Sequence, residues 1–262
     1  MRFYINYVVL CEQGKIRTNN QDNFWCLGSY LQSENSGLGT PIVGRMDNKG
    51  SPAFAVFDGM GGEKHGEVAA YLAAKSFDSF CTETPRHPIR QFLPGICRRM
   101  NAEICSYAKN SHSAHMGTTA AIIVFGRKEI YVCNVGDSKV FRHCSEALTQ
   151  ISRDHTAAAL APAGRKPPLT QHLGIPEDDF IIAPYMAIGE YADGDRYLIC
   201  SDGLSDMVPF GEIESVLTNT RDTFEAAAIL METAMSNGGN DNATIILCDI
   251  RKKDILNRAK KS

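Results

Sequence analysis

Short apolar stretches rich in β-branched residues recur along this chain, and they constrain its fold more than any other feature of the sequence. Stretches of this length and composition are typical of strands. They are Tyr4–Leu10, Phe24–Leu27, Ala53–Phe57, Thr118–Phe125, Ile130–Val135, Lys139–Arg142, Phe180–Ile188, Arg196–Cys200 and Thr244–Ile250. The pattern therefore predicts a protein in which β-sheets form the core.

Two pairs of helices are expected among these strands. Apolar residues recur at helical spacing in Glu67–Phe80, Ile89–Ala108, Phe210–Leu217 and Thr223–Ser236. Several strands are joined by tight turns, such as residues 126–128, and the helices come in pairs rather than after every strand. This order favours antiparallel sheets covered by helices over a parallel doubly wound sheet. Loops rich in glycine, serine, asparagine or proline are expected at Gly28–Ser51 and Thr156–Pro168.

Length and composition favour one domain. The chain has 262 residues, of which 44% are hydrophobic, so a single domain can bury a large core. We expect this domain at residues 1–250 and a basic C-terminal extension at 251–262. The net charge of -3 gives no strong field that would attract nucleic acid or an acidic membrane.

Cysteine usage points to a reducing compartment. The nine cysteines are odd in number and scattered, and none forms a Cys-x-x-Cys pair. No apolar run approaches the roughly 20 residues that a membrane helix needs. We therefore expect a cytoplasmic protein that does not bind a membrane, and we expect it to be a monomer.

Acidic residues at the ends of the predicted strands suggest a metal site. The five residues are Asp22, Asp58, Asp137, Asp202 and Asp241. One aspartate at a strand end is usually a turn former or a helix cap. If the sheets bring these ends together, however, two carboxylates ~4 Å apart repel by ~4 kcal/mol at an effective dielectric of about 20, so cations are needed. Oxygen ligands suit Mg²⁺ or Mn²⁺, and no histidine and cysteine set favours zinc.

Two further residues complete the predicted chemistry. Gly59 follows Asp58 and lets the main chain approach closely, so its carbonyl could bind a metal; the alternative is a plain glycine turn. Arg17 stands shortly before Asp22, and a guanidinium can grip a phosphate with two parallel hydrogen bonds. A lone arginine is more often a solvated surface residue.

The motifs that carry these residues resemble, in order, those of the metal-dependent protein phosphatases of type 2C, most closely the bacterial single-domain branch. The matching motifs are Arg17-x-x-Asn20-Gln21-Asp22, Phe57-Asp58-Gly59-Met60-Gly61-Gly62 with Gly66-Glu67, Gly117-Thr118-Thr119, Asn134-Val135-Gly136-Asp137-Ser138, Asp154-His155, Ser201-Asp202-Gly203-Leu204 and Asp241-Asn242-Ala243-Thr244. The resemblance runs from about Val9 to Ile250. It implies an α+β fold, a four-layer αββα sandwich with two central antiparallel sheets flanked by pairs of helices.

The resemblance also implies a binuclear Mn²⁺ or Mg²⁺ centre. Asp58 would bridge both ions, the Gly59 carbonyl would bind one, and Asp202 with Asp241 would complete the other site. Asp137 would join Asp202 in a third, weaker site.

Two residues would act next to these ions. Asp22 would hold metal-bound water and count among both the catalytic and the metal-site residues. Arg17 would be catalytic by clamping the substrate phosphate.

The sequence departs from the family in several places. Gln21 replaces an acidic residue, and Met60 stands where several members place a proton-donating histidine. We therefore expect the leaving group to take its proton from metal-bound water. Glu63 replaces the usual bacterial histidine, and we interpret the nearby His65 as a solvated residue at a helix start. The segment after His155 is shorter than the usual flap, so substrate choice is where analogy is weakest.

These features predict a serine/threonine protein phosphatase that hydrolyses phosphoserine and phosphothreonine through a metal-activated water. Its partners would be phosphorylated proteins, substrates of a serine/threonine kinase and the kinase itself. One alternative is a catalytically weak family member that acts as a phosphoprotein-binding regulator. Another is a small-molecule phosphomonoesterase, which would need a closed and specific pocket.

Overall fold

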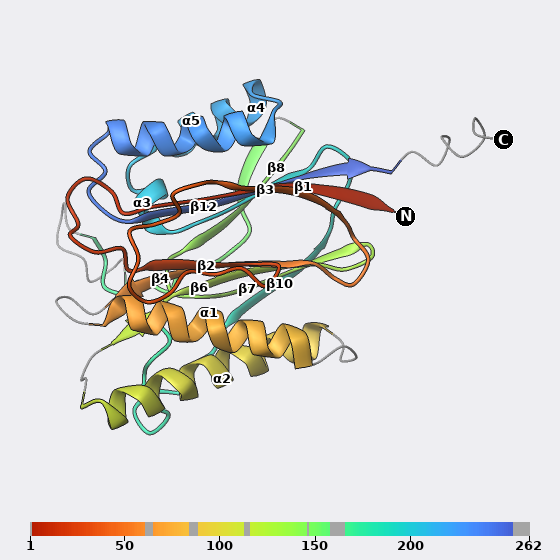
Figure 1. Ribbon diagram of the computed structural model, residues 1–262. Coiled ribbons are helices and arrows are strands. Elements are labelled where there is room, and N and C mark those ends of the chain that lie inside the picture. Colours follow the sequence, from red (N-terminus) through yellow and green to blue (C-terminus); the bar gives the residue numbers. More distant parts are fainter. Residues whose placement is uncertain are drawn as a thin grey trace.

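The computed structural model describes residues 2–60, 65–83, 89–112, 116–145, 147–157 and 166–253, and it shows four layers. Two antiparallel sheets lie face to face, with one pair of helices below them and another pair above (Figure 1). The predicted αββα sandwich is confirmed. No helix within the described ranges is long and apolar enough to cross a membrane.

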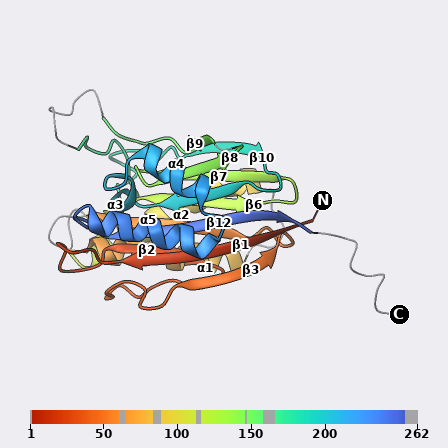
Figure 2. The ribbon, with the colours of Figure 1, turned by 90° about the horizontal axis from the view of Figure 1, so that it is seen from above.

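The first sheet has the strand order β3-β1-β12-β11-β8-β9, which Figure 2 shows from above. Its strands are β1 (Phe3–Glu12), β3 (Ile42–Asp47), β8 (Lys139–Cys144), β9 (Ala147–Gln150), β11 (Arg196–Cys200) and β12 (Ala243–Lys252). β12 thus runs two residues past the domain limit expected at residue 250. Residues 254–262, most of the expected C-terminal extension, lie outside the described part of the chain.

The second sheet has the order β10-β7-β6-β4-β2, and a short strand, β5, also pairs with β4. Its strands are β2 (Asp22–Cys26), β4 (Ala53–Met60), β5 (Gly117–Thr118), β6 (Ala120–Phe125), β7 (Glu129–Val135) and β10 (Tyr185–Glu190). The turn predicted between β6 and β7 is present, with the Gly126 amide donating to the Glu129 carbonyl over 2.8 Å.

The helices cover the outer faces of the sheets. Below the second sheet lie α1 (Gly66–Glu83) and α2 (Ile89–Asn110), and above the first sheet lie α4 (Phe210–Asn219) and α5 (Thr223–Ser236) (Figure 1). A single helical turn, α3 (Asp202–Ser205), follows β11. The end of β4 and α3 lie at one end of the sandwich, opposite the start of β1 (Figure 1), and β11 ends two residues before α3 begins.

The central strands are apolar without interruption because both of their faces are buried. In β4, Phe54 and Val56 pack between the sheets, whereas Ala55 and Phe57 face the helix layer. A sheet covered on both sides gives continuous apolar runs rather than alternation. Replacing a fully buried ring such as Phe54 by alanine costs about 3–5 kcal/mol in similar cores.

Three predictions of secondary structure differ from the structure. β3 lies within the segment predicted as the loop Gly28–Ser51, and the four-residue strand β9 was not predicted at all. The strand predicted from Phe180 begins only at Tyr185. Pro184 precedes that strand and has no amide hydrogen for pairing, and Ile181 is 73% exposed, so the apolar residues before it do not enter the sheet.

Candidate active site

A cavity of about 400 Å³ lies at the end of the sandwich where β4 and β11 end and α3 begins. The residues that line it come from distant parts of the chain, and they are Arg17, Gln21, Asp58, Gly59, Met60, Thr119, Asp137, Lys166, Pro167, Leu169, Asp202 and Asp241. Four of the five predicted carboxylates and both other predicted site residues, Arg17 and Gly59, are therefore brought together.

Asp58 lies near the end of β4, and its backbone is fixed by two threonines. The Asp58 carbonyl accepts hydrogen bonds from the Thr119 amide at 2.9 Å and the Thr118 hydroxyl at 2.9 Å. The Asp58 amide donates to the Thr119 hydroxyl at 3.0 Å. Next along the chain, Gly59 is packed so closely that a Cβ would lie 2.4 Å from the Gln21 carbonyl oxygen. Only glycine allows this approach of the main chain.

Asp202 and Asp241 are brought to the cavity by a close contact between α3 and the start of β12. A Cβ on Gly203 would lie 1.9 Å from the Asn242 carbonyl oxygen, so a side chain there would force the two segments apart. The Ser201 amide, just before Asp202, donates to the Thr244 carbonyl over 3.1 Å.

Asp137 follows β7 in a turn that requires glycine. Gly136 has φ +96°, a left-handed conformation that side chains rarely adopt, and a Cβ there would lie 2.6 Å from the Thr119 side chain. The hydroxyls of Thr119 and Ser138 are 2.6 Å apart. Asp137 is buried, although one edge of it reaches the cavity.

Asp22 lies under the cavity rather than on its wall. It pairs with Asp58 in the register of β2 and β4 and is only 2% exposed. Its Oδ2 accepts hydrogen bonds from the hydroxyls of Ser201 and Thr244, both at 2.7 Å. Burial raises the pKa of Asp22 to about 7, although these two hydrogen bonds act in the opposite direction.

Arg17 reaches the cavity from a loop that Asn242 anchors. Its Nη2 donates to Asp241 Oδ2 over 2.7 Å, and the Arg17 side chain is 49% exposed. The Asn242 amide group donates to the carbonyls of Gln13 and Asn19 at 2.7 and 2.9 Å, on either side of Arg17. The motif that contains Asn242 was recognised from the sequence, but this anchoring role was not.

Lys166 is the cavity residue that the sequence analysis missed. Its ammonium contacts Asp202 Oδ2 and lies 3.3 Å from Asp137 Oδ2 and 3.5 Å from Asp206 Oδ2. Burial lowers the pKa of Lys166, but the negative charges of Asp137, Asp206 and Asp58 outweigh this effect and raise the pKa above its ordinary value. Lys166 lies in the predicted loop Thr156–Pro168, where no periodic pattern marked it.

The departures from the family motifs can also be placed. Met60 lines the cavity, and its thioether has no proton to donate. The Gln21 side chain donates to Glu67 Oε2 over 2.8 Å at the start of α1. His65 precedes α1, and its carbonyl accepts from the Ala69 amide over 3.0 Å, as expected for a residue at a helix start. Glu63 lies outside the described residues.

The carboxylate oxygens that line the cavity are ligands that suit hard divalent ions. Two of these carboxylates, however, form ion pairs with positively charged side chains of the protein. Within the described ranges, no three acidic, histidine or cysteine side chains lie close enough together to hold an ion as they stand. Arg17 pairs with Asp241, and Lys166 pairs with Asp202. Burial, with the charges of Asp22 and Asp137, raises the pKa of Asp58 well above its ordinary value. The carboxylates therefore repel one another, and added positive charge would stabilise the site.

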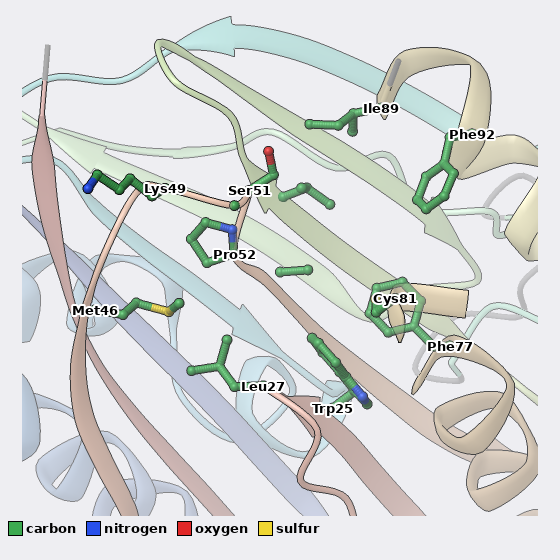
Figure 3. A pocket seen from close by; sticks show the side chains of 13 residues that line it. Trp25, Leu27, Met46, Lys49, Ser51, Pro52, Phe77, Cys81, Ile89 and Phe92 are labelled. Carbon is green, nitrogen blue, oxygen red and sulfur yellow. The ribbon is translucent and has the colours of Figure 1, made fainter. Parts of the chain in front are cut away.

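A second cavity, of about 450 Å³, has a different chemistry. It lies at the edge of the second sheet, and the aromatic side chains of Trp25, Phe77 and Phe92 line it (Figure 3). Lys49 is the one charged side chain among its described lining residues. Without carboxylates, this cavity does not suit a divalent metal ion.

Comparison with known proteins places the chain in a family. The sequence model of the family described as protein phosphatase 2C matches residues 44–238. The serine/threonine phosphatase stp of Listeria monocytogenes serovar 1/2a is 30% identical over 258 residues, which cover 91% of this chain and 93% of that protein. PstP, a serine/threonine protein phosphatase of Mycobacterium tuberculosis strain H37Rv, is 28% identical over 94% of this chain and 45% of its own length.

A comparison with solved structures leads to the same family. The catalytic domain of PstP in complex with two manganese ions superimposes with a TM-score of 0.76 at 28% identity, covering 95% of this chain and 100% of that one. The chain belongs to the protein phosphatase 2C family. The predicted fold, the resemblance to this family and the predicted enzyme class, a metal-dependent phosphoprotein phosphatase, are confirmed.

Proposed function

We propose that this protein hydrolyses phosphoserine and phosphothreonine in other proteins at a centre of two Mn²⁺ or Mg²⁺ ions. The observation that carries the proposal is the convergence of Asp58, Asp202 and Asp241 with Arg17 in one cavity. The two manganese ions of the PstP catalytic domain, and the names of the bacterial relatives, support the same chemistry.

The metal ligands would be Asp58, the Gly59 carbonyl, Asp202 and Asp241. When bound, a pair of hard divalent ions supplies an activated water as nucleophile and neutralises charge on the phosphoryl oxygens. Asp58 would be a ligand of these ions, and contacts with two threonines hold its backbone in place. If Asp241 held an ion, its carboxylate would no longer be needed by Arg17, and the guanidinium would be free to bind another group.

Arg17 would then bind the substrate phosphate. Its side chain is about half exposed and sits at the cavity wall, so it can turn from Asp241 to an incoming dianion. A guanidinium offers two parallel hydrogen bonds to a phosphate, which fixes the orientation of the ester as well as attracting its charge.

Asp22 would act from below the ions by accepting a hydrogen bond from a water. The hydroxyls of Ser201 and Thr244 hold its carboxyl in one orientation, so little reorganisation is needed. A third, weaker ion between Asp137 and Asp202 would compete with Lys166 for the same oxygens.

Phosphoproteins fit the shape of the site better than small phosphate esters do. Asp241 and Arg17 leave the cavity accessible, with 36% and 49% of their side chains exposed. A broader groove of about 890 Å³ adjoins it, and Met60 lines both. A polypeptide can extend along such a groove, whereas a small-molecule enzyme usually encloses its ligand.

Partners and location remain predictions of the same proposal. Substrates of a serine/threonine kinase, and the kinase itself, are the expected phosphoproteins, and the enzyme is expected to act as a monomer. All nine cysteines are free, which supports a reducing compartment such as the cytoplasm. The regulator alternative is not favoured, because the three acidic residues proposed as principal metal ligands, Asp58, Asp202 and Asp241, all line the cavity.

The proposal is tested by phosphate release from phosphoserine and phosphothreonine peptides and from para-nitrophenyl phosphate, each with Mn²⁺ or Mg²⁺. We expect turnover of both peptides, its loss with EDTA and its loss in Asp202→Asn. Glu232→Gln, which removes an exposed carboxylate on α5, is the matched control and should stay active. A folded protein that releases no phosphate with either ion would support the regulator, and cleavage of the aryl ester alone would support a small-molecule enzyme.

A further inference from the structure

We propose that the Lys166 ammonium takes the place of a third divalent ion between Asp137 and Asp202, so that this enzyme binds two ions and supplies the third cation from its own chain. The inference rests on the proposed two-ion centre. It assigns a positioning role to a residue that no motif contains.

The contacts of Lys166 define a cation position. Its Nζ reaches Asp202 Oδ2, lies 3.3 Å from Asp137 Oδ2 and is 3.5 Å from Asp206 Oδ2. The side chains of Asp137 and Asp202 are almost fully buried, whereas that of Lys166 is 48% exposed. The aliphatic stem thus remains near solvent while the charged end is directed onto the acidic residues. An ammonium has three hydrogens to donate, which suits three carboxylates.

A neighbouring lysine makes a useful contrast. Lys139 pairs with Asp154 Oδ2 at 2.6 Å, and it contacts Asp137 only through the backbone carbonyl, at 3.1 Å. It therefore supports the turn that carries Asp137 but leaves the Asp137 carboxylate free for another cation. Among the positive charges within the described ranges, Lys166 is the one whose ion pairs include both Asp137 and Asp202.

The segment that delivers Lys166 is anchored. The Ala157 amide donates to the Pro168 carbonyl at 2.9 Å, and the Thr170 amide donates to the His155 carbonyl at 2.8 Å. These bonds hold the backbone just after Lys166, and Pro167 and Leu169 form part of the cavity wall. A tethered charge of this kind has a high effective concentration at its partner, which an ion from solution must exceed.

The ammonium and a divalent ion cannot share these oxygens. An ion bound between Asp137 and Asp202 would lie within about 4 Å of Nζ, a distance at which two positive charges repel strongly because the site is partly shielded from water. Lys166 must leave before the ion can bind. Removing the ammonium should therefore open a third, weak metal site.

Counting bound Mn²⁺ by equilibrium dialysis tests the inference without relying on activity. We expect two ions per chain in the wild type and in Lys166→Arg, which keeps the charge. Lys166→Met has a similar length without the charge, and it should bind a third ion at least roughly 10-fold more tightly than the wild type does. Adding Asp137→Asn to Lys166→Met should remove that third ion.

Other results would contradict the inference. A wild type that binds three ions, or a Lys166→Met protein that still binds two, would show that Lys166 does not hold this position. If Lys166→Met does not fold, the neutral and polar Lys166→Gln takes its place: it should bind the third ion, and a folded Lys166→Gln protein that binds only two would reject the proposal. A wild type that binds fewer than two ions contradicts the proposed two-ion centre itself.

Discussion

Arg17 donates a hydrogen bond to Asp241 over 2.7 Å, although 224 positions separate the two residues in the chain. The bond joins the proposed phosphate clamp to a proposed metal ligand. Because both side chains are partly exposed, the pair contributes little to stability. Its importance is that Asp241 and Arg17 can each be released for another partner.

Replacing Arg17 by alanine should therefore separate substrate binding from metal binding. We expect the KM for a phosphopeptide to rise roughly 10-fold or more, since a charge-assisted hydrogen bond contributes about 1.5–3 kcal/mol, with a smaller change in kcat. Mn²⁺ affinity should not fall, because Asp241 loses a competitor. Arg17→Lys, which keeps charge but not the planar fork, should be intermediate. Unchanged kinetic constants in Arg17→Ala would reject the clamp.

Replacing Asp58 or Asp241 by alanine should instead reduce metal binding and kcat. Each change removes a proposed metal ligand, so bound Mn²⁺ should decrease and kcat should fall on the order of 10³-fold, equivalent to about 4 kcal/mol of lost transition-state stabilisation. Dialysis and steady-state kinetics on the same samples measure both effects. If either variant kept its full complement of ions, that residue would not be a ligand.

The acidic part of the site could be predicted because each aspartate adjoins an apolar strand or strand-like stretch. Asp58 follows its stretch directly and Asp202 comes one residue after its own, and the antiparallel register of β2 and β4 places Asp22 opposite Asp58. Lys166 could not be predicted in this way. Its contacts with Asp137 and Asp202 depend on how an irregular segment folds back over the cavity, and no periodic pattern encodes that path.

The same distinction holds for the fold. Central strands such as β4 are buried on both faces, so they can be recognised in the sequence as continuous apolar runs. The edge strand β3 has Val43 exposed and contains Gly44, and it forms because that glycine leaves room for Tyr7 on β1: a Cβ at Gly44 would lie 2.2 Å from the Tyr7 hydroxyl. Such a strand depends on its neighbour rather than on its own composition.

The buried carboxyl of Asp22 predicts a pH dependence of stability in the metal-free protein. Its pKa is raised to about 7 in the folded state, mainly by burial, against an unfolded value of about 3.9. The stabilising contribution is therefore complete below about pH 4 and is lost as the pH rises through about 7. Asp22→Asn can still accept hydrogen bonds from Ser201 and Thr244, but it does not titrate.

Urea unfolding in EDTA between pH 4 and pH 8 measures this effect. The free energy of unfolding of the wild type should fall relative to that of Asp22→Asn as the pH rises, by at most about 1.4 kcal/mol per pH unit, and the difference should level off above pH 7 to 8. Parallel curves for the two proteins would show that Asp22 ionises at its ordinary pKa.

A pair of glycine variants tests whether the packing of α3 on β12 positions the site. Gly203→Ala should destabilise the protein by roughly 2 kcal/mol or more and weaken Mn²⁺ binding, because the new methyl would lie 1.9 Å from the carbonyl oxygen of Asn242, the residue after Asp241. Gly211→Ala is the matched control: a Cβ there meets nothing within 4 Å, and alanine in α4 should stabilise the helix by about 0.5–1 kcal/mol. Urea unfolding and Mn²⁺ dialysis compare the two. If Gly203→Ala bound metal as tightly as Gly211→Ala, the close approach would serve folding alone and would not set the spacing of the two aspartates.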